Sequence, residues 1–366
     1  MDLYESAYRW LYRVPGSLGV ANVAGCTIFS ALCGSSPATC AAIGGMGIPE
    51  MRKRGYSGGL AAGLIAAGGT LGILIPPSIT LIIYGVIAEQ SIGKLFIAGI
   101  IPGLLLAVFF ALWVVFKYTQ ERKQARAGTG SDVSAELLRQ EHFTWAQRLE
   151  ALPRLLPFLI LIGVIMIAMY GGFGTPSEVA GVGAVGALIL VAMLYQCYRW
   201  QDIKVILTGT ARESCMIMMI IAMAFLFTYV LSYLRISQST AEWLVALDMS
   251  KWALLFWVNI LLLVLGFFLP PVAIILMVTP VILPGILAAG FDPIWFGIVL
   301  TINMELGLIT PPVGLNLFVI NGIAPDIKFG EILRGITPFI VIICLYIVLL
   351  AVFPEIVMWL PNMFYQ

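Results

Sequence analysis

Charged residues are scarce in this sequence, and their scarcity excludes a soluble globular protein. Only 11% of the 366 residues are charged, whereas 61% are hydrophobic and the mean hydropathy is +1.01. A single core cannot hide so much apolar surface from water. The sequence therefore predicts an all-α membrane protein with about ten membrane segments. Its longest charge-free runs are 55–88, 95–116, 214–234, 252–291 and 335–354.

Residues for several other functions are also missing. The net charge of +1 leaves no concentrated basic face, which excludes a nucleic acid as a partner. A single histidine, His142, and six cysteines without a CxxC pair argue against a transition-metal site. The sequence also lacks an HExxH motif and paired acids at a useful spacing. We therefore expect no catalytic residues, no organic cofactor and no enzyme activity.

The one extended polar stretch, 117–154, divides the chain in two. It contains His142, which we interpret as a solvated side chain, and many of the charges. Positive charge near helix ends marks the cytoplasmic side, so this stretch and the cluster Arg52, Lys53 and Arg54 are expected there. We predict a first repeat at 1–116, a cytoplasmic polar loop at 117–154, scaffold or arm helices at 155–250 and a second repeat at 251–366.

The two halves share an internal repeat. When the sequence is aligned with itself so that Pro76 falls on Pro311, here called the repeat register, identical or similar residues correspond although overall identity is low. The matches fall mainly on glycine and proline, which fix backbone geometry. Interrupted apolar segments at corresponding positions of two halves are typical of a transporter's binding site. The first-half positions are Pro49, Gly55, Tyr56, Leu71, Gly72, Pro76 and Pro77, and their counterparts are Pro284, Gly290, Phe291, Leu306, Gly307, Pro311 and Pro312.

Two proline pairs, Pro76–Pro77 and Pro311–Pro312, lie inside apolar segments and predict broken helices. Consecutive prolines remove two backbone donors and free the carbonyls one turn earlier. In hydrocarbon a free carbonyl costs on the order of several kcal/mol, so both breaks must face protein, water or a cation. Thr310 and Asn316 add side-chain oxygens near the second break. A hard cation such as Na⁺ prefers oxygen ligands of this kind.

A short turn precedes each break, and both turns predict re-entrant hairpins. Residues 34–39 (GSSPAT) separate two apolar stretches, 18–33 and 38–49, that are each short for a full crossing. Residues 269–273 (LPPVA) fall at the matching place in the second half. A helix that starts after the first turn would aim its N-terminal dipole at an anionic group. We therefore expect the two turns and the two breaks to converge on one site.

Two acids in apolar surroundings are further candidates. Glu305 follows Asn303 just before the second break, where we expect it to order the loop or to lie on an ion path. Glu178 follows Thr175 and Pro176, and we interpret it as the first-turn acid of a helix at the membrane edge.

With these motifs the chain resembles the large membrane subunit (DctM type) of tripartite ATP-independent periplasmic (TRAP) transporters. The resemblance implies inverted repeats, two re-entrant hairpins and an elevator-type transport domain that moves against a scaffold. It implies import of an organic acid anion, of the C4-dicarboxylate or sialic acid type, by symport with Na⁺. The similar stretches run in family order: GSSPATCAAIGGMGIPEMRKRGYS (34–57), GGTLGILIPPSITLIIYGVIAEQSIGKLFIAGIIPG (68–103), GTPSEVAGVGA (174–184) and NMELGLITPPVGLNLFVINGIAPD (303–326).

The resemblance also implies partners, a location and site residues. The partners are a small DctQ-type membrane subunit and a DctP-type periplasmic binding protein, and the location is the bacterial inner membrane, whose lipid bilayer the chain crosses several times. Ion binding is expected at Ser35, Ser36, Thr70, Gly72, Pro76, Pro270, Pro271, Thr310 and Pro312. Substrate binding is expected at Ser36, Thr39, Ser78, Asn303 and Asn316.

Other interpretations stay open. Family members carry further scaffold helices before the segment that corresponds here to 15–29, so the resemblance implies an N-terminally incomplete scaffold. A truncated fragment that does not transport is therefore one alternative. A stand-alone Na⁺/organic anion symporter of a related inverted-repeat family, which needs no binding protein, is a second. A membrane transferase acting on lipid is a third, for which the sequence offers no motif.

Overall fold

The computed structural model describes residues 8–12, 14–126, 145–171, 173–196, 199–236, 239 and 249–364. The principal helices of the first half are α2 (Ser17–Cys33), α3 (Ser36–Lys53), α4 (Gly58–Leu74), α5 (Ile79–Ile87) and α6 (Ile92–Arg126). The middle contains α7 (Trp145–Tyr170), α8 (Pro176–Tyr195) and α9 (Trp200–Tyr233). The second half contains α11 (Lys251–Gly266), α12 (Pro271–Ala288), α13 (Pro293–Ile309), α14 (Leu315–Ile323), α15 (Phe329–Val352) and α16 (Glu355–Phe364).

Several of these helices are long and apolar enough to cross a membrane. Within the described ranges they are α6, α8, α9, α12 and α15, and the bent pair α4 and α5 makes a sixth if it counts as one span. Every regular element in those ranges is a helix. The prediction of an all-α, multi-pass membrane protein is thus confirmed. The expected total of about ten segments stays a prediction.

The helix bounds of the two halves follow the repeat register. This alignment carries Ser36, where α3 begins, onto Pro271, where α12 begins. It also carries both ends of α4 onto both ends of α13. Gly55 and Gly290, which correspond in the same register, have φ of 79° and 83°, a backbone region that favours glycine. Each half therefore contains two helices joined by a tight turn, followed by a helix that stops at a proline pair.

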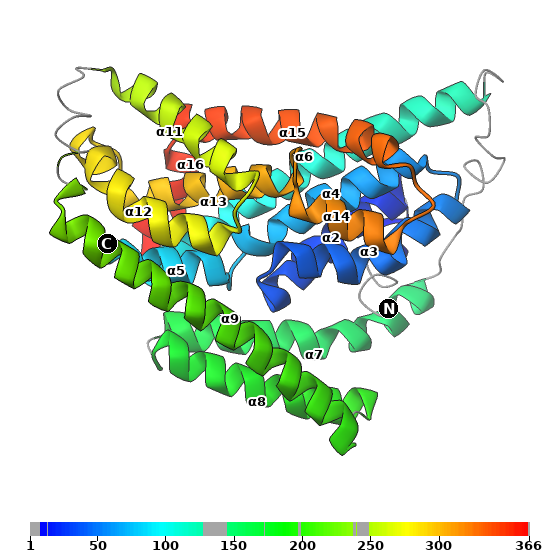
Figure 1. Cartoon of the computed structure of the whole chain (residues 1–366). Coiled ribbons are helices and arrows are strands. Elements are labelled where there is room, and N and C mark those ends of the chain that lie inside the picture. Colours follow the sequence, from blue (N-terminus) through cyan, green and yellow to red (C-terminus); the bar gives the residue numbers. More distant parts are fainter. Residues whose placement is uncertain are drawn as a thin grey trace.

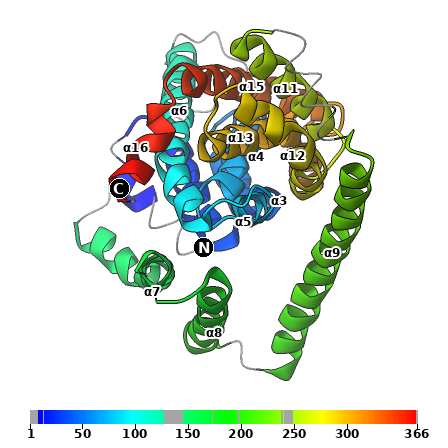
Figure 2. The same cartoon turned by 90° about the vertical axis from the view of Figure 1, so that its left-hand side faces the viewer.

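The broken helices α4 and α13 form the centre of the molecule (Figures 1 and 2). Nearly all of their residues are buried, because both helices are mainly apolar and other helices pack around them. By contrast, α7, α8 and α9 lie outside this bundle in both views. Most residues of α9 are exposed, and among them are many large apolar side chains. Its surface is thus suited to contact with lipid or protein.

Helices α4 and α15 cross at unusually close range, and glycines make this possible. A Cβ built on Gly335 of α15 would overlap the carbonyl group of Gly59 and lie 3.0 Å from its Cα. A Cβ built on Gly63, one turn further along α4, would overlap the carbonyl group of Gly335 and lie 2.8 Å from the nitrogen of Ile336. The two backbones therefore touch without side chains between them.

Two predictions about local structure have clear outcomes. Thr175 and Glu178 form a reciprocal capping box at the start of α8, which confirms Glu178 as a first-turn acid. The polar stretch 117–154 is helical at both ends, because 117–126 continue α6 and 145–154 begin α7. His142 and the rest of that stretch, 127–144, lie outside the described residues.

In the basic cluster, Arg52 forms an ion pair with Asp326, which lies between α14 and α15.

Candidate functional site

The turn between α2 and α3, here called the first tip (34–37), is built by glycine and a proline-primed helix start. Gly34 ends α2 in the left-handed region, at φ 60°. Ser35 is extended, and α3 begins at Ser36 with Pro37 in its first turn, where a missing N–H costs nothing. A Cβ on Gly34 would lie 3.1 Å from the carbonyl oxygen of Pro77. The first tip therefore rests against the first proline pair.

The first break (75–78) separates α4 from α5 and bends the chain by 41°. Its prolines, Pro76 and Pro77, have no N–H to give to the last turn of α4. Ser78 replaces part of what is lost: its hydroxyl donates to the carbonyl of Ile73 at 2.5 Å and accepts from the N–H of Leu81 at 3.4 Å. The carbonyl of Ile73, freed by the proline pair, is thus hydrogen-bonded to the Ser78 side chain. A carbonyl in an apolar setting requires such a partner.

The second half has the same parts with fewer polar side chains. Its second tip (267–270) joins α11 to α12, and its second break (310–314) joins α13 to α14. Thr310 donates from its hydroxyl to the carbonyl of Leu306 at 2.6 Å. Gly314 has φ 59° and lets the chain turn into α14. The Pro76–Pro77 and Pro311–Pro312 peptide bonds are both cis.

Corresponding glycines allow close backbone contact between the first tip and α4, and between the end of α11 and α13. A Cβ on Gly72 of α4 would lie 2.8 Å from the carbonyl carbon and oxygen of Ser35. A Cβ on Gly307 of α13 would lie 2.7 Å from the Cα and carbonyl carbon of Gly266, at the end of α11. Both distances are shorter than a real Cβ contact allows, so the first tip packs backbone against backbone on α4, and the end of α11, directly before the second tip, does so on α13. Glycine is thus required twice, for the same reason, at corresponding positions of the repeat register.

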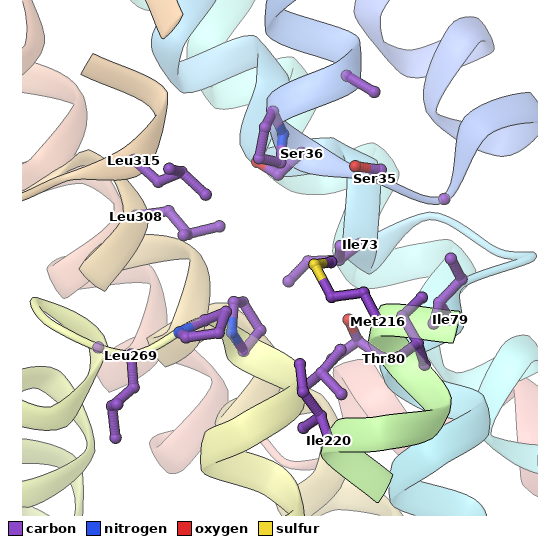
Figure 3. A pocket seen from close by; sticks show the side chains of 18 of the residues that line it. Ser35, Ser36, Ile73, Ile79, Thr80, Met216, Ile220, Leu269, Leu308 and Leu315 are labelled. Atoms are coloured by element: carbon purple, nitrogen blue, oxygen red, sulfur yellow. The ribbon is translucent and has the colours of Figure 1, made fainter. Parts of the chain in front are cut away.

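Both tips line one cavity of about 860 Å³, together with Val313 of the second break and with Ile73 and Ile79, which flank the first break (Figure 3). In the close view Ser35 and Ser36 come from the first tip, and Leu308 and Leu315 flank the second break. The wall is mainly apolar, as in many small-molecule sites. The remaining residues are Gly34, Pro37, Ala38, Thr80, Gly266, Phe267, Phe268, Leu269, Pro270, Pro271, Val272, Glu213, Met216, Ile217 and Ile220.

The residues expected to bind ion or substrate fall into three groups. Ser35, Ser36, Pro270 and Pro271 line the cavity. A second group does not line the cavity: Gly72 contacts the first tip, Pro76 and Ser78 lie in the first break, Thr310 and Pro312 lie in the second break, and Asn316 of α14 donates to the Ser36 hydroxyl. Thr39, Thr70 and Asn303 are buried behind the wall, where their side chains donate to Ser35, to Ala67 and to Asn259. The binding roles of all of them stay predictions.

Two features of the site were not predicted. Glu305 was expected near the second break, but its carboxylate accepts from the Ser36 hydroxyl at 3.0 Å and from the N–H of Ile73 at 3.3 Å, so it joins the first tip to α4. Helix α9 also contributes Glu213 and Met216 to the wall of the cavity. The sequence predicted only scaffold or arm helices for this region. In the sequence its one signal is that Glu213 stands directly before the charge-free run 214–234.

The whole chain is similar to known transporter subunits. The family described as "Tripartite ATP-independent periplasmic transporter, DctM component" matches residues 1–356. The C4-dicarboxylate TRAP transporter large permease protein DctM of Pseudomonas aeruginosa is 38% identical over 98% of this chain and 81% of its own length. The isethionate TRAP transporter permease protein DctMQ of Oleidesulfovibrio alaskensis is 34% identical over 98% of this chain and 54% of its own length. The sialic acid TRAP transporter large permease protein SiaM of Vibrio cholerae is 33% identical over 99% and 81%.

Proposed function

Since the chain belongs to the DctM family of tripartite ATP-independent periplasmic transporters, we propose that it carries substrate and ion in a Na⁺-coupled importer of organic acid anions. Family membership makes it the large permease subunit of a secondary transporter and not an enzyme. Large permeases of this family work with a small membrane subunit and a periplasmic binding protein. The proposal concerns the coupling ion, the class of substrate and the way in which the subunit moves.

The observation that carries the proposal is the meeting of helix ends around one cavity. Helices α3, α5, α12 and α14 all begin at its wall, with Ser36, Ile79, Pro271 and Leu315 in their first turns. Helices α4, α11 and α13 end there. Helix N-termini favour anions, whereas C-terminal carbonyls favour cations. One cavity with both kinds of end can bind an organic anion together with its coupling cation.

Relatives differ in the substrates that their names give, which include C4-dicarboxylates, isethionate and sialic acid. For this chain we propose a carboxylate of the C4-dicarboxylate or sialic acid type, since the relative at 38% identity is a C4-dicarboxylate permease. Na⁺ would bind where carbonyls and hydroxyls of a tip and a break meet, with proline and glycine positions contributing backbone oxygens. The bound ion would stabilise the closed tips and so favour movement of the loaded state.

Movement is proposed to follow an elevator scheme in the bacterial inner membrane. Backbone contacts at Gly72 and Gly307 join the first tip to α4 and the end of α11 to α13, and Glu305 and Asn316 bond across the halves to Ser36, so these segments can travel as one body. Helices α7, α8 and α9 lie outside that body and are suited to a scaffold (Figure 2). The fused permease name DctMQ of one relative supports a small membrane subunit as the neighbour.

Reconstitution tests the proposed function directly. The subunit is placed in proteoliposomes with its small partner, and uptake of labelled succinate is measured with binding protein outside and an inward Na⁺ gradient. We expect uptake that needs both the gradient and the binding protein. Uptake without the binding protein would indicate a stand-alone symporter instead. Uptake that is equal in K⁺ and Na⁺ would contradict Na⁺ coupling.

Removing the hydroxyl of Thr310 is expected to weaken the Na⁺ dependence of uptake. In the wild type the Thr310 hydroxyl donates its proton to the carbonyl of Leu306, which leaves its oxygen free to coordinate an ion. Thr310→Ala removes this oxygen from the second break. Loss of one such ligand should raise the half-saturating Na⁺ concentration by about tenfold. The measurement is initial uptake rate against Na⁺ concentration. Thr337→Ala is the matched control, since Thr337 makes the same bond to Leu333 at 2.8 Å on the exposed side of α15. An unchanged Na⁺ curve for Thr310→Ala would reject this ligand.

A further inference from the structure

Glu305 is a buried acid of the second half whose side chain, among the described residues, forms its hydrogen bonds with the first half. It lies on α13 with 1% of its surface exposed. Oε2 accepts from the hydroxyl of Ser36 at 3.0 Å, and Oε1 accepts from the N–H of Ile73 at 3.3 Å. The carboxylate thus links the first tip to the end of α4, just before the first break.

Within the described part of the chain, no basic side chain forms an ion pair with Glu305. Ion pairs such as those of Arg52 with Asp326 and of Lys53 with Glu50 lie at exposed helix ends instead. A buried charge without a partner is costly, so it requires hydrogen bonds and a compensating positive charge. The hydrogen bonds are present, and the negative charge is balanced either by a proton on the carboxyl group or by a mobile cation.

Ser36 has only one way to arrange its hydroxyl in this cluster. Its oxygen accepts a hydrogen bond from Nδ2 of Asn316 at 2.9 Å. Its single proton goes to Glu305. A serine hydroxyl has one donor and two lone pairs, so one lone pair remains and no proton remains. Ser36 is fully buried at the wall of the cavity and can therefore only accept from a ligand.

Asn316 adds a second acceptor. Its amide nitrogen donates to Ser36 and, at 3.3 Å, to the carbonyl of Ala66. Its amide oxygen is buried and has no hydrogen-bond partner among the described residues. Ser36 and Asn316 thus offer unused oxygen acceptors beside a negative charge. Such a cluster attracts a cation and repels a carboxylate.

The second half has no counterpart to this arrangement. The repeat register pairs Glu305 with Thr70 and Ser36 with Pro271. Thr70 donates to Ala67 within its own helix, and Pro271 has neither a hydroxyl nor an N–H. The two tips therefore stand at corresponding places in the fold but differ in polarity.

We propose that Glu305 is a positioning residue that fixes the hydroxyl of Ser36 as an acceptor, so that the first tip selects the cation and gives no donor to the organic anion. This inference rests on the proposed function and refines it, because Ser36 was expected to bind both ion and substrate. Glu305 acts through Ser36 and need not touch either ligand. The device operates in the ionised form of Glu305, because a carboxylate only accepts hydrogen bonds whereas a protonated carboxyl group can also donate.

Glu305→Gln tests whether Glu305 must act only as a hydrogen-bond acceptor, because glutamine has nearly the same shape but also has an N–H donor. The amide nitrogen of glutamine can donate to Ser36, which frees the serine proton to point toward the ion. We expect the half-saturating Na⁺ concentration to rise by about tenfold or more, in proteoliposomes with the partner proteins. The half-saturating succinate concentration at saturating Na⁺ should stay within about twofold of the wild type. Na⁺-induced thermal stabilisation of the purified membrane complex should fall in parallel.

Further variants distinguish loss of the Glu305–Ser36 hydrogen bond from a general loss of folding. Glu305→Asp keeps an acceptor-only group and should retain the Na⁺ response, whereas Ser36→Ala should lose it to the same extent as Glu305→Gln. The double variant Glu305→Gln with Ser36→Ala should be no worse than either single change, because both remove one interaction. Glu355→Gln, an exposed acid on α16, is the charge control and should behave as the wild type.

The outcomes distinguish this inference from the proposed function. A wild-type complex without Na⁺-driven uptake overturns both. Na⁺-driven uptake in the wild type with a normal Na⁺ curve in Glu305→Gln overturns the inference alone. So does a higher half-saturating succinate concentration with unchanged Na⁺ dependence, since Ser36 would then donate to the anion. If Glu305→Gln does not fold, a well-folded Glu305→Asp that has lost the Na⁺ response overturns the inference.

Discussion

Gly72→Ala is expected to reduce Na⁺-driven uptake by about 100-fold, the scale on which misplacing a positioned group by about 1 Å acts. The new Cβ would lie 2.8 Å from the carbonyl carbon and oxygen of Ser35 and 2.9 Å from the Cα of Ser36. These are backbone atoms, so no side chain can rotate away. The first tip has to move off α4, which separates Ser36 from Glu305. The measurement is the initial rate of succinate uptake in the reconstituted complex.

Gly45→Ala is the control for that experiment. Gly45 lies on α3, the helix that starts at the first tip, and a Cβ there would meet nothing within 4 Å. It should leave uptake unchanged or improve stability slightly, as alanine does in an exposed helix. Surface expression and monodispersity must be equal for the two variants. If Gly72→Ala transports at the wild-type rate, the tip is not held by this contact.

Gly335→Ala is expected to destabilise the helix bundle rather than the site. Its Cβ would overlap the carbonyl group of Gly59 on α4, so α15 has to separate from α4, the central helix on which it packs. Overpacking of this kind typically costs about 1–3 kcal/mol, and backbone contact places this variant at about 3 kcal/mol or above. The midpoint of thermal unfolding in detergent should fall by roughly 5 °C or more.

Gly330→Ala shows whether the loss of stability in Gly335→Ala comes from the close crossing of α4 and α15. Gly330 lies on the same helix, α15, and a Cβ there would meet nothing within 4 Å. Its melting midpoint should equal or exceed that of the wild type, because alanine favours helix. Equal midpoints for Gly335→Ala and the wild type would mean that the two helices can separate without cost.

Features that depend on local chemistry could be read from the sequence. A proline pair removes backbone donors wherever it occurs, so the breaks at Pro76 and Pro311 follow from the residues themselves. The start of α8 is equally local, since Thr175 and Glu178 cap each other three residues apart. The repeat register was also visible, because glycine and proline fix backbone geometry, and the bounds of α4 and α13 correspond in it. The inverted repeats themselves stay a prediction.

Features that depend on distant contacts could not be read in this way. Glu305 was recognisable as an acid in an apolar segment, but its partner Ser36 is 269 residues away and no spacing rule connects them. Gly72 was noticed as a repeated glycine, yet its contact with Ser35 appears only when two helices pack. The α9 wall has no polar pattern beyond Glu213, and its placement beside the cavity depends on tertiary structure.

The cluster at the first tip also sets an order of events during biosynthesis. Ser36 leaves the ribosome early, whereas Glu305 and Asn316, its two partners, follow 269 and 280 residues later. Until then the early half resides in the membrane with this hydroxyl lacking both of those partners. Contacts of such long sequence separation form late and slowly. Translation has to pass Asn316 on α14 before both partners can lock the first hairpin, so a ribosome that stalls earlier leaves an insertion intermediate with an open tip.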